Sequence, residues 1–249
     1  MNIAKRQRVR KCILLASFAL FPVTIFYFSP YLIEMGAWNG IVAGSALAFL
    51  LQLLSAIFLR RACCGWVCPA GGLQELEGDI IGKPSKSGKR QLLKWVIWVP
   101  WVASIIAGFV VAGGISSIEP LYHIDCGMSV TSVGALAIYL GIVALFFVPN
   151  LFLGKRAMCQ CICWMAPFMI IGEKIGGALH APQLHVEANP SACVSCGACD
   201  KACPMSLPVS ELLASGAISH TECIQCGACC DSCRKDALTL SFSKMRDTE

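Results

Sequence analysis

A tandem cysteine motif between Cys193 and Cys233 constrains this chain more than any other feature of its sequence. The first half reads Cys193-Val-Ser-Cys196-Gly-Ala-Cys199-Asp-Lys-Ala-Cys203-Pro, and the second reads Cys223-Ile-Gln-Cys226-Gly-Ala-Cys229-Cys-Asp-Ser-Cys233. Each half is C-x2-C-x2-C-x3-C, the spacing in which three close thiolates hold one iron–sulfur cluster and the fourth binds another. The segment therefore predicts a small domain that holds two clusters.

Two other uses of these cysteines are weaker interpretations. Zinc sites usually stop at four ligands, with a wider gap between their C-x2-C pairs. The chain has 17 cysteines, and a high cysteine content is also typical of secreted disulfide scaffolds. Here, however, the cysteines cluster at metal-ligand spacing, and many lie beside long apolar stretches. We therefore expect reduced thiols that face the cytoplasm.

Long apolar stretches dominate the rest of the sequence. Hydrophobic residues make up 56% of the 249 residues and charged residues only 14%, well below the usual quarter for soluble proteins. Four stretches come close to the ~20 residues that a membrane-spanning helix needs, at about 12–33, 37–59, 95–115 and 133–153. The first resembles a signal peptide, but it is longer than a usual signal core and no clean cleavage site follows it.

The expected fold class is thus an α-helical membrane protein with a small C-terminal α+β ferredoxin domain. Residues 1–180 are expected to form four transmembrane helices as two pseudo-repeated hairpins, and residues 181–249 the domain with two 4Fe–4S clusters. The loops at 29–36 and 116–132 contain no Lys or Arg, so all 20 positive charges fall on one side of the predicted membrane. The positive-inside rule makes that side cytoplasmic, with both termini there, as in a multi-pass protein of the inner (cytoplasmic) membrane.

A second cysteine pattern occurs where two of the predicted spans end. Arg61-Ala-Cys-Cys64-Gly-Trp-Val-Cys68 aligns with Arg156-Ala-Met-Cys159-Gln-Cys-Ile-Cys163, and both segments keep R-A-x-C-x3-C. Cysteines four residues apart lie on one face of a helical turn. If the two hairpins pack as a pseudo-symmetric pair, these cysteines converge as a third metal site, with ligands Cys64, Cys68, Cys159 and Cys163. The alternative is that they are ordinary buried cysteines, which behave as small hydrophobic residues.

With these motifs, the sequence resembles the four-helix membrane ferredoxins of the periplasmic nitrate reductase system (NapH-type), and more broadly the polyferredoxin-like 4Fe–4S membrane proteins. Those proteins have four membrane helices, two C-x3-C-P motifs and two C-terminal 4Fe–4S motifs. Cys64-x3-Cys68-Pro69 matches the first of these motifs. The chain departs in two places, because Cys163 is separated from Pro167 by three residues and Arg234 follows Cys233 where proline is expected.

The resemblance implies a crossed ligand arrangement for two 4Fe–4S clusters. One cluster would be bound by Cys193, Cys196, Cys199 and Cys233. The other would be bound by Cys223, Cys226, Cys229 and Cys203.

The resemblance also implies electron transfer between the membrane quinone pool or a membrane partner and a redox partner protein, such as a ferredoxin, a flavoprotein or a reductase subunit. The chain would then be an electron-transfer subunit of an oxidoreductase complex, for example the quinol dehydrogenase component of an anaerobic respiratory system. A competing hypothesis is a redox-sensing regulator, or an assembly protein that hands metal to a respiratory enzyme. A third is a membrane anchor whose ferredoxin domain merely docks a reductase.

Other cofactors and partners have less support. The four histidines lie outside the predicted spans, so no haem is expected in the helix bundle. The basic loops adjoin the spans, which favours contact with anionic membrane lipid over nucleic acid.

Overall fold

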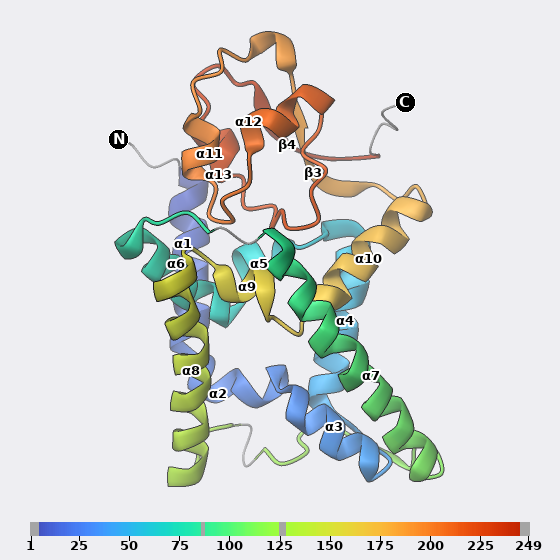
Figure 1. The fold of residues 1–249 in the computed structure, drawn as a ribbon. Coiled ribbons are helices and arrows are strands. Elements are labelled where there is room, and N and C mark those ends of the chain that lie inside the picture. The colour runs from blue at the N-terminus through green and yellow to red at the C-terminus, as the bar shows by residue number, and fades with distance from the viewer. Residues whose placement is uncertain (1–4, 86–87, 125–127, 245–249) are drawn as a thin grey trace.

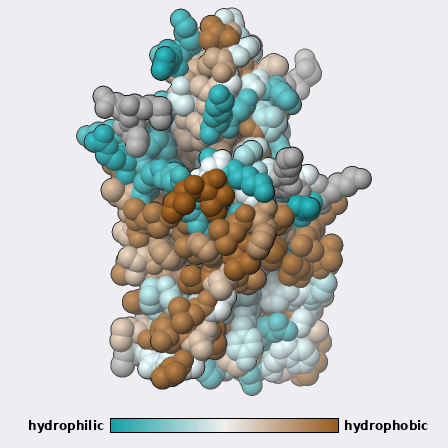
Figure 2. All heavy atoms as spheres, turned by 60° about the vertical axis from the view of Figure 1, so that its left-hand side comes forward, coloured by the Kyte–Doolittle hydropathy of each residue, from teal (hydrophilic) through white to brown (hydrophobic). Residues whose placement is uncertain are grey.

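The computed structural model describes residues 5–85, 88–124 and 128–244. Helices form most of the molecule, and a small cysteine-rich unit lies at one end of them (Figure 1). The start of α1 (Lys5–Ala19) and the end of β4 (Leu238–Ser243) both lie at this end. On the face seen in Figure 2, hydrophobic residues gather in a broad band below a hydrophilic cap.

Two helices are long and apolar enough to cross a membrane. They are α7 (Leu93–Val111) and α8 (Val133–Leu153), which coincide with the third and fourth predicted stretches. Only 11% of the most apolar window of each is buried inside the protein. Apolar surface left exposed on this scale requires a lipid or protein environment.

The first predicted stretch, 12–33, is not one straight helix. The chain forms α1, then α2 (Phe21–Thr24) and a 3-10 turn, η1 (Ile25–Phe28), with a bend of 58° after α1. It then begins α3 (Pro30–Trp38), which Ser29 caps. Pro22 and Pro30 explain the breaks, because proline lacks the N–H that would continue a helix and its ring clashes with the preceding turn. The bent pair α1–η1 counts as at most one candidate span.

The second predicted stretch, 37–59, also begins differently. Strand β1 (Ile41–Ala43) pairs in parallel with β2 (Ser117–Glu119), and only then does α4 (Gly44–Leu59) start. With 16 residues, α4 is about 24 Å long, shorter than the ~30 Å hydrocarbon core. Instead of four straight spans, the described residues thus contain two membrane-length helices, or three with the bent pair, and a shorter apolar one.

The predicted internal repeat is visible in the order of the helices. Each copy has an apolar helix, a five-residue helix that carries cysteine, and a 13-residue helix that begins at or next to a proline. The first copy is α4, α5 (Ala62–Trp66) and α6 (Pro69–Ile81), and the second is α8, α9 (Ala157–Cys161) and α10 (Ala166–Ala178).

The two copies pack crosswise. Helix α10 packs against α4, and α6 packs against α8 and α1. A Cβ atom on Gly172 of α10 would come within 2.4 Å of the Leu53 carbonyl oxygen of α4. Glycine is therefore needed where α10 meets α4, as in other close helix pairs at membrane depth. The crosswise packing brings the short helices α5 and α9, with their cysteines, to the centre of the molecule (Figure 1).

The C-terminal unit combines one strand pair with short helices. Strand β3 (Gln183–Ala188) pairs antiparallel with β4, and between them lie η3 (Pro190–Ala192), α11 (Ala198–Ala202), α12 (Val209–Leu212), η4 (Leu213–Ser215) and α13 (Ala228–Ser232). A further 3-10 turn, η2 (Gly88–Leu92), precedes α7. The core of the unit is small and includes Val186, Met205, Leu207, Val209, Ile218 and Ile224.

Candidate metal centres

Both halves of the tandem motif have the same backbone geometry. Gly197 (φ 67°) and Gly227 (φ 69°) adopt the left-handed conformation at the start of α11 and α13, and Ser195 and Gln225 do so two residues earlier. Glycine adopts this conformation without steric cost. These positive φ angles curl each loop, and the three cysteines before and within each short helix line one hollow.

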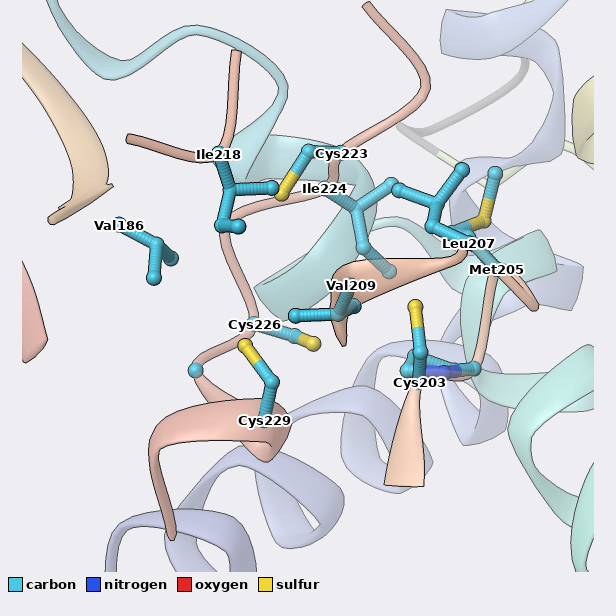
Figure 3. A pocket seen from close by; sticks show the side chains of 12 residues that line it. Val186, Cys203, Met205, Leu207, Val209, Ile218, Cys223, Ile224, Cys226 and Cys229 are labelled. Atoms are coloured by element: carbon cyan, nitrogen blue, oxygen red, sulfur yellow. The ribbon is translucent and has the colours of Figure 1, made fainter. Parts of the chain in front are cut away.

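Four cysteines line a small cavity in the C-terminal unit. Cys223, Cys226 and Cys229 come from the second motif, whereas Cys203 is the last cysteine of the first motif (Figure 3). The remaining walls are apolar, with Val186, Met205, Leu207, Val209, Ile218 and Ile224. Burial raises the pKa of the Cys203 and Cys223 thiols to about 12. Deprotonated thiols at this site therefore require a cationic partner such as metal.

The other four cysteines line a larger, open hollow between this unit and helices α1 and α6. Cys193, Cys196 and Cys199 of the first motif lie here together with Cys233, the last cysteine of the second. Cys196 is exposed, and its neighbour Val194 is 61% exposed. The two hollows thus group the cysteines as the crossed arrangement requires, and the arrangement itself stays a prediction.

The loop of the second motif is docked on the helical part of the molecule. Gln7 of α1 donates to the Cys226 carbonyl oxygen (2.8 Å), and the Trp66 indole of α5 donates to that of Gln225 (3.1 Å). A Cβ atom on Gly65 would lie 2.3 Å from the Ile224 carbonyl oxygen. The second-motif loop is thus in direct contact with α5, whereas the first-motif loop borders the open hollow.

A buried ion-pair network fixes this docking. Glu222, next to Cys223, pairs with Arg61 (2.6 Å) and with Lys94. Burial alone would raise the pKa of the Glu222 carboxyl, but Arg61 and Lys94 outweigh it and hold the pKa below its usual value. Arg61 also donates to the Thr221 carbonyl oxygen (3.0 Å). Breaking a buried pair of this kind costs about 3–5 kcal/mol.

The membrane-surface cysteines lie at the same junction. Cys64 and Cys159 are in α5 and α9, and both are buried. Cys68 and Cys163 lie just beyond those short helices, so the expectation that each pair shares a helical turn is wrong. The reason is that α5 ends at Trp66 and α9 at Cys161, before the second cysteine of each pair.

The four thiols lie near enough to influence one another electrostatically. Burial raises the pKa of Cys68 well above its ordinary value, and the thiols of Cys64, Cys159 and Cys163 raise it further. Burial, with Cys159 and Cys64, likewise raises the pKa of Cys163 to about 12. The pairs from the two repeats therefore meet at one place.

Side chains from α6 and α10 contact these membrane-surface cysteines. The Gln74 amide donates to the Cys159 sulfur (3.1 Å), and the Cys64 sulfur lies 3.2 Å from the Met169 sulfur. Among the described residues, no three Cys, His, Asp or Glu side chains lie at metal-ligand spacing. This holds for the tandem-motif cysteines as well as for the membrane-surface ones.

Comparison with known protein families identifies the cofactor. A family model described as a 4Fe–4S dicluster domain matches residues 192–238, and one described as a 4Fe–4S binding domain matches residues 42–87. The chain carries two 4Fe–4S clusters. The second match is informative because it spans α4, α5 and α6, including Cys64 and Cys68.

Two relatives resemble most of the chain. The "Putative electron transport protein YccM" of Escherichia coli is 25% identical over 86% of this chain, which spans 59% of the length of that protein. The "Uncharacterized protein MJ0750" of Methanocaldococcus jannaschii is 26% identical over 85% of this chain and 85% of its own length. No solved structure matches the chain.

The residues around the tandem motif fit 4Fe–4S clusters. The small cavity is apolar and presents four thiols, and the Ser195 amide donates to the Cys193 sulfur (3.4 Å) in the open hollow. Amide hydrogen bonds to sulfur and burial are the means by which a protein adjusts cluster potential.

Sequence reasoning missed the polar residues that surround the cysteines. Arg156 is 1% exposed and donates to the carbonyl oxygens of Cys64 (3.1 Å) and Gly71 (3.2 Å). Gln74 and Glu222 were not singled out either, because nothing in their spacing sets them apart. Arg61 and Arg156 did have a signal, since each opens one copy of R-A-x-C-x3-C.

Proposed function

We propose that this protein is a membrane-bound iron–sulfur electron-transfer protein of the NapH type. It relays electrons between the quinone pool or a membrane partner and a soluble redox partner. The clusters supply one-electron chemistry, and the chain positions them between two different surroundings. The relative named for electron transport supports this role.

One observation carries the proposal. The first-motif loop borders an open hollow and exposes Cys196, whereas the second-motif loop is anchored on α5 through Trp66 and Glu222. The exposed loop suits a soluble redox partner, and the anchored loop suits exchange with the membrane side. A protein with one accessible and one membrane-docked cluster is suited to relay electrons rather than to store them.

The charge pattern supports a position in the cytoplasmic membrane. No Lys or Arg occurs in residues 12–59 or 95–154, which include α4, α8 and the part of α7 that follows Lys94. The basic residues flank these segments at the end that carries the cysteine-rich unit. By the positive-inside rule, that unit and both termini are cytoplasmic, and α1–η1, α4, α7 and α8 provide four membrane passes.

The relay is tested with the full chain in liposomes. Anaerobically purified protein is reduced with dithionite, excess reductant is removed, and decylubiquinone is added while the visible cluster absorbance is followed. The expected result is reoxidation in liposomes that contain the quinone analogue and none in liposomes without it. Clusters that remain reduced in both would contradict a quinone-linked relay.

A variant separates the relay from the assembly hypothesis. If Cys64→Ser with Cys159→Ser abolishes quinone-linked reoxidation, the membrane-surface cysteines belong to the electron path. If the same variant keeps normal reoxidation but a respiratory partner enzyme fails to mature in cells, the protein acts in assembly instead.

A further inference from the structure

We propose that Cys64, Cys68, Cys159 and Cys163 together hold a third iron–sulfur centre, with two thiolates from each repeat. This centre goes beyond the two clusters of the tandem motif. Its position is at the junction of α5, α9, α6 and the second-motif loop.

The first support is the way the two repeats meet. Equivalent short helices, α5 and α9, each deliver one cysteine and are followed by the second. Arg156 of the second repeat reaches across to the Cys64 carbonyl oxygen of the first, and Gln74 of the first reaches across to the Cys159 sulfur of the second. The four thiols are therefore held by contacts between the repeats as well as by their own segments.

The second support is two ion pairs that join one repeat to the other. Glu75 of α6 pairs with Arg156 (2.7 Å) at the start of α9, and Glu173 of α10 pairs with Arg60 before α5. The two glutamates occupy equivalent positions, because Pro69 precedes Glu75 by as many residues as Pro167 precedes Glu173. The pairs fix both cysteine-bearing segments in one relative position.

The third support is a set of buried guanidinium N–H groups without a hydrogen-bond partner. Arg61 and Arg156 are 0% and 1% exposed. Within the described residues, Nε of both arginines and Nη2 of Arg61 have no hydrogen-bond partner. Buried N–H groups without a partner are rare and costly. Both guanidinium groups interact electrostatically with Cys159, so the partner they fit is an anionic group at the four thiols.

The fourth support is a buried side-chain amide beside the four thiols, that of Gln225. Gln225 is 0% exposed, and in the described structure neither of its side-chain amide atoms has a partner. Its backbone is bonded to Trp66 of α5, so it lies in the contact between the second-motif loop and the first repeat. A buried amide donor between two anionic iron–sulfur groups would lower the cost of placing them close together.

Iron–sulfur is favoured over zinc by two facts. Four cysteines also suit a structural zinc ion. However, the family model that covers Cys64 and Cys68 describes a 4Fe–4S binding domain, and the site adjoins the loop of a 4Fe–4S cluster. Arg156 interacts electrostatically with both Cys159 and Cys226, so a third centre here would lie beside the second-motif cluster.

The test counts metal in the full chain purified anaerobically in detergent. Two 4Fe–4S clusters account for about eight irons, so wild type is expected to contain clearly more than eight, with matching acid-labile sulfide. Cys64→Ser with Cys159→Ser should lower the count to about eight and remove one component of the EPR spectrum of the dithionite-reduced protein. The matched control is Cys63→Ser with Cys161→Ser, which replaces the neighbouring cysteines in the same helices.

Each outcome decides the question. Loss of the extra iron in the Cys64/Cys159 variant alone, with about eight irons retained as evidence of a folded protein, supports the centre. About eight irons in wild type would overturn it. So would one zinc ion per chain in place of the extra iron, or equal loss of iron in the control variant. Because the wild-type count does not depend on any substitution, a variant that fails to fold leaves the proposal testable.

Discussion

Arg156 is the residue whose removal the junction should tolerate least. It is buried, it pairs with Glu75, and it donates to two carbonyl oxygens of the first repeat. Burial alone would raise the Glu75 pKa, but Arg156 and Arg10 outweigh it and lower that pKa to about 2. The ion pair therefore contributes its full stability above about pH 4.5 and loses it as the pH falls toward 2.

Arg156→Gln is expected to destabilise the protein at neutral pH by about 3–5 kcal/mol, because it leaves a buried carboxylate with one cation fewer. The value should lie near the lower end, since Arg10 still pairs with Glu75. The measurement is the apparent melting temperature in detergent. Lys155→Gln removes the same charge one residue away and is expected to have little effect, and equal losses in the two variants would contradict this role of Arg156.

Glu77 should give the opposite pH dependence. It is 4% exposed on α6, and the amide of Asn150 donates to it. Burial raises its pKa to about 7, although the Asn150 hydrogen bond opposes the rise. A folded pKa above the ordinary value means that stability is greatest below pH 4.5 and declines as the pH rises through about 7.

Glu77→Gln should therefore flatten the dependence of the melting temperature on pH between about 4.5 and 7. Glutamine keeps a group that can bond Asn150 but carries no charge to desolvate. At pH values above this window the variant should be at least as stable as wild type. Asp79→Asn is the control on the same helix, since Asp79 is exposed, and a wild-type slope in Glu77→Gln would show that this carboxyl does not titrate as inferred.

Helix α5 requires glycine where it meets the second-motif loop. Gly65 lies against the Ile224 carbonyl oxygen, where a methyl group would approach to 2.3 Å. Gly65→Ala should therefore push the second-motif loop away from α5, at a cost of about 1–3 kcal/mol. Quinone-linked reoxidation should slow while the iron content stays at the wild-type value.

Gly177→Ala is the control for this change. Gly177 is in α10, and a Cβ atom there would meet nothing within 4 Å. Alanine has the better helix propensity, so this variant should be neutral or slightly stabilising. If Gly65→Ala left both stability and reoxidation unchanged, the docking of the second-motif loop on α5 would not be the path between membrane and cluster.

The elements also show which parts of the fold a sequence can predict. Continuous apolar composition predicts α7 and α8 well, because their helical state depends on local composition alone. The break between α1 and α3 depends on Pro22 and Pro30, and a hydropathy window averages over both. The β1–β2 pair and the α4–α10 packing join residues far apart in sequence, and no local pattern encodes such contacts.

The candidate sites also divide into features that local sequence predicts and features that depend on contacts between distant residues. Cysteine spacing predicts the two sets of the tandem motif, because three cysteines of each set are close together in the sequence. The convergence of Cys64 with Cys159 was expected from the repeat alone. Glu222, Gln74 and Gln225 escaped notice because their roles arise only when the C-terminal unit docks on the helices.

At the scale of the whole molecule, the distribution of charge predicts a single membrane orientation. Every Lys and Arg lies outside residues 12–59 and 95–154. Moving the basic loop around η2 to the opposite side would place Arg61 and Lys94 across the membrane from Glu222, with which both pair. The ion pairs and the positive-inside rule therefore require the same arrangement.

This orientation is tested with reporter fusions in a bacterial host. Green fluorescent protein joined after Pro84 or after Glu249 should fluoresce, and alkaline phosphatase at the same positions should be inactive, because both positions are expected in the cytoplasm. After Leu121, between α7 and α8, the pattern should reverse. Active phosphatase after Glu249 would place the cysteine-rich unit outside the cell. A loss of reversal at Leu121 would instead mean that α7 does not cross the membrane.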